Sequence, residues 1–229
     1  MKNSNKIFFG ILTLMLMLTV VNVASASAVS SESYNIDNEN TYKGHMKANT
    51  QYTFRFRHRT QIRINSSANL TVNIYCDALK IGEKDFALEI NCTKPLELNM
   101  TCKEEEAELG LLKGHTYQYR NRNRYRYEEG FCISLKVNCT ENLHAKLMIQ
   151  ATEQNKKGKW AYYNETTSEW VTVNTILKDG YLVAETDHFS VWTILIPDNS
   201  LLIITGTIIG VVLTAGVIIG VIFYIRRRR

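Results

Sequence analysis

Apolar and polar residues alternate along most of the middle of the chain. One series starts at Tyr52, Phe54 and Phe56 and keeps its apolar residues at even positions. A second series, between Phe131 and Ile149, keeps them at odd positions. Successive side chains of a strand point to opposite faces, so each series predicts strands with one apolar face. Such short strands, separated by polar breaks, favour an all-β fold, and we expect an antiparallel β-sandwich.

One hairpin can be drawn in detail from residues 117–127, which are nearly palindromic. A turn at their centre would place Tyr119 opposite Tyr125 and Tyr117 opposite Tyr127, two aromatic pairs that stabilise a sheet.

Arginines occupy the other face of this hairpin and the first predicted strand. The candidate anion-binding residues are Arg55, Arg57, Arg59, Arg120, Arg124 and Arg126. We expect a solvated hairpin face; if the face binds a ligand, an anionic glycan or a lipid headgroup would suit it. A surface protein is a further candidate partner of the chain.

The C-terminal end carries a long apolar segment. Residues 201–225 form a run of 25 residues without a charge, followed by four arginines at 226–229. A helix of about 1.5 Å per residue and this length would cross a bilayer core of about 30 Å, with the arginines in the cytoplasm. We therefore expect one transmembrane helix in contact with the lipid bilayer. Small residues four apart would support a homodimer through this helix, namely Gly206, Gly210, Gly216 and Gly220.

The N-terminal end is typical of a secretory signal peptide. Lys2 and Lys6 precede an apolar run, and the small residues at 24–28 suit cleavage. We assign residues 1–27 to the signal peptide, 28–49 to a polar segment and 50–200 to the extracellular β-domain. An uncleaved N-terminal anchor is the alternative.

Charge excludes one class of partner. Six of the 27 basic residues lie in the two terminal segments, which leaves 21 basic against 22 acidic residues in the domain between them. A net charge of −1 there gives no basic footprint, so we expect no nucleic-acid partner.

All five cysteines lie in the predicted extracellular domain, where disulfides persist. The alternation puts four of them on apolar faces and Cys132 on a polar face, so we expect two disulfides and a free Cys132. If residues 86–92 and 96–102 form a hairpin, Cys92 and Cys102 lie about 20 Å apart and cannot be joined. Two pairings remain open: Cys76–Cys92 with Cys102–Cys139, or Cys76–Cys102 with Cys92–Cys139.

Six Asn-x-Ser/Thr sequons mark candidate glycosylation sites. They are Asn65, Asn69, Asn91, Asn99, Asn138 and Asn164. Cys92 and Cys139 occupy the middle of two sequons. Disulfide formation would compete with glycan transfer there, so we expect the lowest occupancy at Asn91 and Asn138.

No catalytic or metal-binding motif is present in the sequence, so we expect no cofactor, no metal and no conventional enzyme activity. Residues 159–196 contain two tryptophan-bearing segments and end in a strand that begins His-Phe-Ser. This segment, about a sixth of the chain, resembles the end of archaeal cell-surface β-domains and, more remotely, the cleavage-site subdomain (GAIN domain) of adhesion receptors. The tripeptide is similar to the self-cleavage site of certain nucleoporins. The resemblance implies an archaeal envelope and a possible cleavage between Phe189 and Ser190.

Self-cleavage would use three neighbouring residues. The Ser190 hydroxyl would attack the Phe189 carbonyl carbon and convert the amide into an ester, which water then opens, while His188 takes the hydroxyl proton. A packed final strand, with His188 and Ser190 bonded to their neighbours, is the alternative. The sequence therefore predicts a type I single-pass cell-surface glycoprotein with a recognition or structural role at the envelope, and a self-cleaving surface domain as the competing function.

Overall fold

The structure is a computed structural model that describes residues 30–118, 124–138, 143–198, 224 and 226–227. The predicted signal peptide, Arg120, Cys139 and the four glycines of the predicted dimer contact lie outside the described residues.

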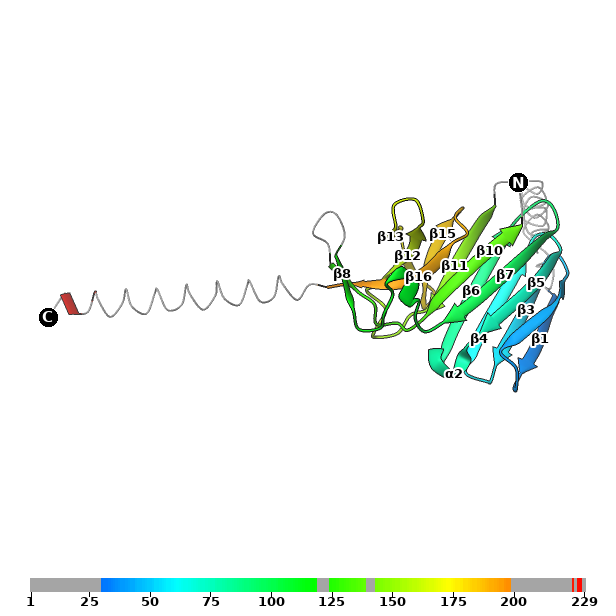
Figure 1. Cartoon of the computed structure of the whole chain (residues 1–229), viewed down its shortest axis with the longest axis horizontal. Helices are drawn as coiled ribbons and strands as arrows, with labels where there is room; N and C mark the ends of the chain where they lie inside the picture. The colour runs from blue at the N-terminus through cyan, green and yellow to red at the C-terminus, as the bar shows by residue number, and fades with distance from the viewer. Residues whose placement is uncertain (1–29, 119–123, 139–142, 199–223, 225, 228–229) are drawn as a thin grey trace, which may run out of the picture. The chain divides into compact units, whose positions relative to one another are not determined.

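The described residues form two β-sheets (Figure 1). Sheet A has seven strands in the order β1-β3-β4-β6-β11-β15-β14. Its strands are β1 (Ser30–Ile36), β3 (Thr50–Phe56), β4 (Thr60–Ser66), β6 (Lys84–Asn91), β11 (His144–Gln150), β15 (Tyr181–Thr186) and β14 (Ile176–Lys178).

Sheet B has nine strands, seven of them in the order β13-β12-β16-β10-β7-β5-β2, with β9 attached to β16 and β8 attached to β9. Its strands are β13 (Glu169–Thr172), β12 (Lys159–Asn164), β16 (Val191–Pro197), β10 (Cys132–Asn138), β7 (Leu96–Lys103), β5 (Leu70–Cys76), β2 (Thr41–Met46), β8 (Thr116–Gln118) and β9 (Arg124–Arg126). Two short helices, α2 (Ala78–Ile81) and η1 (Ala107–Leu109), lie in the connections.

The chain winds between the two sheets from β4 to β7. Successive strands alternate from sheet A to sheet B, so β4 pairs with β6 in parallel and β5 pairs with β7 in parallel. These parallel neighbours lie side by side in Figure 1 and give the molecule a solenoid-like arrangement. The predicted hairpin of residues 86–92 and 96–102 is wrong, because β6 and β7 belong to different sheets.

The predicted antiparallel β-sandwich is therefore wrong. An antiparallel β-sandwich does not describe a coil with parallel pairs at its centre, although the structure is mostly β. None of the helices formed by the described residues is long and apolar enough to span a membrane. The predicted transmembrane segment 201–225 lies outside the described residues except for Tyr224.

The apolar residues of the alternating series fill the space between the sheets. Phe54 and Ile62 from sheet A and Ile74 and Leu98 from sheet B are fully buried in one cluster. Trp160, also fully buried, donates a hydrogen bond from Nε1 to the Leu182 carbonyl oxygen at 2.9 Å. Since Trp160 lies on β12 and Leu182 on β15, this bond joins the two sheets. The period-2 pattern therefore identifies the side chains that form the core.

A second, smaller apolar cluster covers the outside of sheet B at one end. It contains Leu111, Tyr127, Cys132, Ala161, Trp170 and Leu195. Cys132 is buried in this cluster, although the alternation places it on the polar face of its strand. The segment that follows β7 and the hairpin of β8 and β9 supply the covering residues, which no local alternation predicts.

The β8–β9 hairpin forms, but its register differs from the predicted one. Tyr117 lies opposite Tyr125, whereas the palindrome predicts Tyr127 as its partner. Tyr127 is instead fully buried in the second cluster, and its hydroxyl donates to the Glu104 carbonyl oxygen. Burial of this ring fixes the register. Tyr119 lies outside the described residues.

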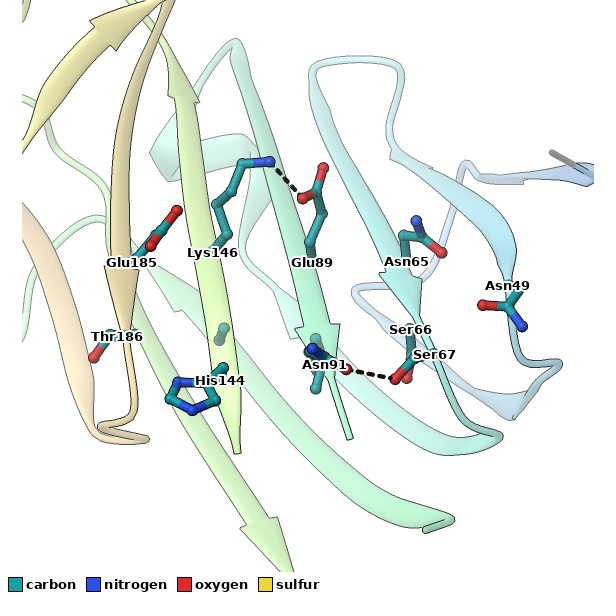
Figure 2. A pocket seen from close by; sticks show the side chains of 12 residues that line it. Asn49, Asn65, Ser66, Ser67, Glu89, Asn91, His144, Lys146, Glu185 and Thr186 are labelled. Atoms are coloured by element: carbon teal, nitrogen blue, oxygen red, sulfur yellow. Dashed lines mark hydrogen bonds and ion pairs between the residues drawn. The ribbon is translucent and has the colours of Figure 1, made fainter. Parts of the chain in front are cut away.

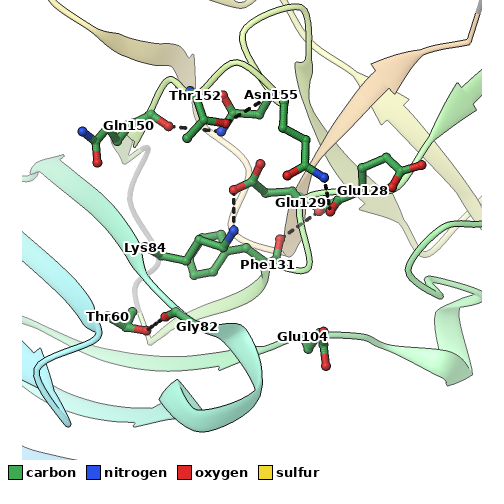
Figure 3. A network of polar contacts seen from close by, with 12 residues as sticks. Thr60, Gly82, Lys84, Glu104, Glu128, Glu129, Phe131, Gln150, Thr152 and Asn155 are labelled. Carbon is green, nitrogen blue, oxygen red and sulfur yellow. Dashed lines mark hydrogen bonds and ion pairs between the residues drawn. The ribbon is translucent and has the colours of Figure 1, made fainter.

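A buried polar network joins the start of β6 to the connections beside it (Figure 3). The Lys84 ammonium donates to Glu129 Oε1 at 2.8 Å. The side chain of Glu129 is 3% exposed and that of Lys84 is 17% exposed. Asn155, which is fully buried, accepts from the Thr152 amide at 2.7 Å and donates to the Gln150 carbonyl oxygen at 3.1 Å.

Candidate functional site

A row of polar side chains crosses the outer face of sheet A. Asn65 on β4 lies opposite Glu89 on β6, which lies opposite Lys146 on β11, which lies opposite Glu185 on β15. The inward neighbours in these strands are buried, so this row faces away from the core. Lys146 forms an ion pair with Glu89 (Figure 2). We call these four residues the polar row.

A cavity of about 340 Å³ lies along the polar row and extends to the strand ends. β4 and β6 run parallel, so their carboxyl ends meet at the same edge of the sheet. Ser67 directly follows β4 and Asn91 is the last residue of β6, and their side chains are hydrogen-bonded at 3.2 Å. Asn49 and His144 also line the cavity (Figure 2). Amide, hydroxyl, imidazole and charged groups thus converge in one depression.

A hydrogen-bonded triad lies next to this cavity. Arg63 Nη2 donates to Asp85 Oδ1 and to the Tyr181 hydroxyl, each at 2.9 Å. The Tyr181 hydroxyl in turn donates to Asp85 Oδ2 at 2.9 Å. The guanidinium carbon of Arg63 also lies 5.2 Å from the centroid of the Tyr181 ring, which is a cation–π distance. These bonds fix the orientation of the tyrosine ring.

A second cavity of about 140 Å³ joins the triad to the polar row. It is lined by Arg63 and Tyr181 and shares Asn65 and Glu89 with the first cavity. The small side chain of Ala87 also lines this cavity, and Ala87 lies opposite Arg63 in the strand pairing. Nε of Arg63 is buried and has no hydrogen-bond partner among the described residues. We call the two adjoining cavities the sheet A groove.

The predicted self-cleavage residues are bonded to other groups. The Ser190 hydroxyl donates to the Tyr163 carbonyl oxygen at 2.7 Å. The His188 ring stacks on Tyr162, with centroids 4.6 Å apart, and Phe189 packs partly buried against the main core. Within the described part of the chain no hydrogen bond joins His188 to Ser190. Self-cleavage stays the competing prediction from the sequence, and these contacts do not test it.

The predicted arginine face is divided between two elements. Arg55 lies on β3 and donates to the Ser33 hydroxyl at 2.6 Å, and Arg57 and Arg59 lie in the turn that follows β3. Arg124 and Arg126 lie on β9 and form ion pairs with Asp198 and Glu128. The first group belongs to sheet A and the second to sheet B. The arginines of the predicted face therefore do not lie together on one element.

The sequon asparagines are spread over both sheets. Asn91 and Asn138 are exposed, and Asn69 is exposed while its side-chain oxygen accepts from the Ala48 amide at 2.9 Å. Asn99 is half-buried and accepts from the Asn73 amide at 3.2 Å. The half-buried Asn164 accepts from the Thr166 and Thr167 amides.

Two sequon asparagines, Asn65 and Asn91, line the sheet A groove. A glycan on either residue would extend into the groove and compete with any ligand bound there.

The described cysteines are all buried and all unbonded in the structure. Cys76 lies directly opposite Cys102 across β5 and β7. Burial, together with the neighbouring Cys76 thiol, raises the pKa of Cys102. Burial also raises the pKa of Cys132 to about 12. Cys92 Sγ lies 3.5 Å from Ser66 Oγ.

Metal binding receives no support from this geometry. Across residues 30–118, 124–138 and 143–198, no group of three or more histidine, cysteine, aspartate or glutamate side chains is arranged to hold a metal ion.

Sequence reasoning missed the sheet A groove because its residues are distant in the chain. Asn65, Glu89 and Lys146 meet only through the parallel pairing of β4 with β6 and the pairing of β6 with β11. Comparison of the chain with protein-family models, with curated proteins and with solved structures finds no match.

Proposed function

We propose that this chain is a recognition protein of the cell surface that binds carbohydrate in the sheet A groove. The observation that carries the proposal is the polar row, in which amide, carboxylate and ammonium groups lie side by side on four adjacent strands. A site in the cell envelope is supported by the secretory signal and the six sequons in the sequence.

The chemistry of the groove matches a ligand with many hydroxyl groups. A sugar hydroxyl both donates and accepts, and the groove offers acceptors on Glu89 and Glu185, donors on Lys146, and both on Asn65. Neighbouring strands lie about 4.8 Å apart, so these groups form a regular series along the groove. Such a series can hold several hydroxyl groups of one oligosaccharide at once.

The Tyr181 ring and Ala87, beside the polar row, supply a less polar surface. The Tyr181 ring is held in place by Asp85 and Arg63, and Ala87 leaves space next to it. Apolar lining with a few fixed polar groups is the usual composition of a small-molecule site. The C–H groups of a sugar ring would lie against this surface while its hydroxyls bond to the polar row.

Binding of oligosaccharides to the full chain tests the proposal. The chain is produced in a host without N-glycosylation, so that Asn65 and Asn91 stay unmodified, and is applied to an array of neutral and acidic oligosaccharides. Affinity for a retained oligosaccharide is then measured for Lys146→Ala and for Lys136→Ala. Lys136 is the matched control, because it is an exposed lysine on β10 of sheet B.

We expect Lys146→Ala to weaken binding about tenfold, since it removes a charged hydrogen-bond donor worth roughly 1.5 kcal/mol. Lys136→Ala should bind as the unmodified chain does. The proposal fails if no oligosaccharide is retained, or if Lys146→Ala binds as tightly as Lys136→Ala.

A further inference from the structure

Two buried cysteines face each other across parallel strands. Cys76 is the last residue of β5 and lies directly opposite Cys102 on β7. Both are fully buried in the main core, so both side chains point to the same side of sheet B. Paired strands lie about 4.8 Å apart, within the range of about 4.4–6.8 Å that separates the Cα atoms of a disulfide. The backbone therefore needs no rearrangement to join them.

The two thiol groups lie on directly paired residues of neighbouring strands. Burial raises the pKa of Cys102, and the neighbouring Cys76 thiol raises it further. The structure contains them as thiols. Oxidation would join these two sulfur atoms by a covalent bond.

The other described cysteines are poorly placed to compete. Cys92 follows β6 and comes shortly before Leu96, which pairs with Leu70 at the start of β5. Cys76 lies at the opposite end of that strand, which has seven residues. At about 3.3 Å per residue this distance is about 20 Å, far beyond the reach of a disulfide. Cys132 points into the second cluster, on the opposite side of sheet B.

We propose that Cys76 and Cys102 form a disulfide in the secreted chain. The thiolate of one cysteine attacks a small-molecule disulfide and releases one thiol, and the thiolate of the other attacks the mixed disulfide and releases the second. The donor disulfide takes up two electrons and two protons in total and becomes two thiols. The inference is independent of carbohydrate binding and needs only an oxidising compartment.

The bond would close one turn of the coil. Between the two cysteines the chain forms α2, crosses to sheet A as β6 and returns to sheet B as β7. A link at this point ties the start of that turn to its end. Of the two partners that the sequence leaves open for Cys76, this disulfide would use Cys102 and exclude Cys92.

Peptide mapping of the full chain tests this inference. The chain is secreted from a host with an oxidising secretory pathway, or refolded with oxidised glutathione as the donor. Free thiols are alkylated in denaturant without reductant, N-glycans are removed enzymatically, and the chain is digested with a glutamyl endopeptidase. Glu83 separates Cys76 from Cys92, and Glu97 separates Cys92 from Cys102, so the pairings among these three cysteines give different linked peptides.

We expect one linked species that contains Cys76 and Cys102 and that separates into two peptides on reduction. In Cys92→Ser, the matched control, this species should persist. In Cys102→Ala it should disappear and Cys76 should be alkylated. The inference is overturned if Cys76 and Cys102 are both alkylated in the unsubstituted chain, or if either is linked to a different cysteine.

Discussion

The buried ion pair between Lys84 and Glu129 allows a quantitative prediction about stability. Lys84→Met removes the ammonium and leaves the Glu129 carboxylate, 3% exposed, without its cation. Breaking a buried pair from one side costs about 3–5 kcal/mol, because the remaining charge stays desolvated. Replacing both residues by methionine removes that charge as well. We therefore expect Lys84→Met to lower the free energy of unfolding by about 3 kcal/mol or more and the double variant to lower it by about 1 kcal/mol or less.

Urea unfolding of the full chain, followed by tryptophan fluorescence, measures these differences. Lys80→Met is the matched control. Lys80 lies 3.4 Å from Asp77, but its side chain is 71% exposed, so its ion pair is solvated. Its loss should change stability by less than about 0.5 kcal/mol. The reasoning is refuted if Lys84→Met costs no more than Lys80→Met, or if the double variant is less stable than Lys84→Met.

Three further predictions concern single residues. Cys132, with its pKa raised from 9.0 to about 12, should react with iodoacetamide at pH 8 at least about a hundredfold more slowly in the folded than in the unfolded chain. Its protonated thiol contributes stability below pH 9 that is lost as the pH rises toward 12, and Cys132→Ala should reduce that loss in urea titrations at successive pH values. Gly180 has a φ of +80°, with open space where a Cβ would lie, so Gly180→Ala should lower the free energy of unfolding of the chain by about 1–2 kcal/mol through backbone strain alone. The same urea unfolding curves measure this change, and no loss would contradict the turn geometry. Ser190→Ala should give the same single full-length mass as the unsubstituted chain, because the Ser190 hydroxyl is bonded to Tyr163; a break before Ser190 in the unsubstituted chain alone would establish self-cleavage.

The positions of the strands and their inward faces can be predicted from the sequence. Phe54, Ile62, Val72 and Leu147 alternate with polar residues, and each of them is buried. The order in which the strands alternate between the two sheets cannot be predicted in the same way. Residues 92–95 connect β6 to β7, and the sequence allows β7 either to pair with β6 in the same sheet or to join the other sheet. Both arrangements place the alternating apolar residues on a buried face. The crossing at this point produces the parallel pairs that overturn the predicted sandwich.

Features that depend on distant segments are the hardest to predict. Cys132 is buried because Tyr127 and Trp170 cover its face of sheet B, and neither residue follows from the alternation around Cys132. The polar row likewise needs the pairing of Asn65 with Glu89 and of Glu89 with Lys146. Each of its members taken alone is an ordinary polar residue of a strand. Only the register makes them neighbours.

The location of bound carbohydrate on the full chain tests the central claim most directly. The unglycosylated chain is titrated with an oligosaccharide retained from the array while the backbone amide resonances of both sheets are followed. We predict shifts at Asn65, Asn91, Lys146 and Tyr181 around the sheet A groove and none at Lys136 on sheet B. Shifts confined to sheet B, or an absence of shifts at saturating oligosaccharide, would contradict the account.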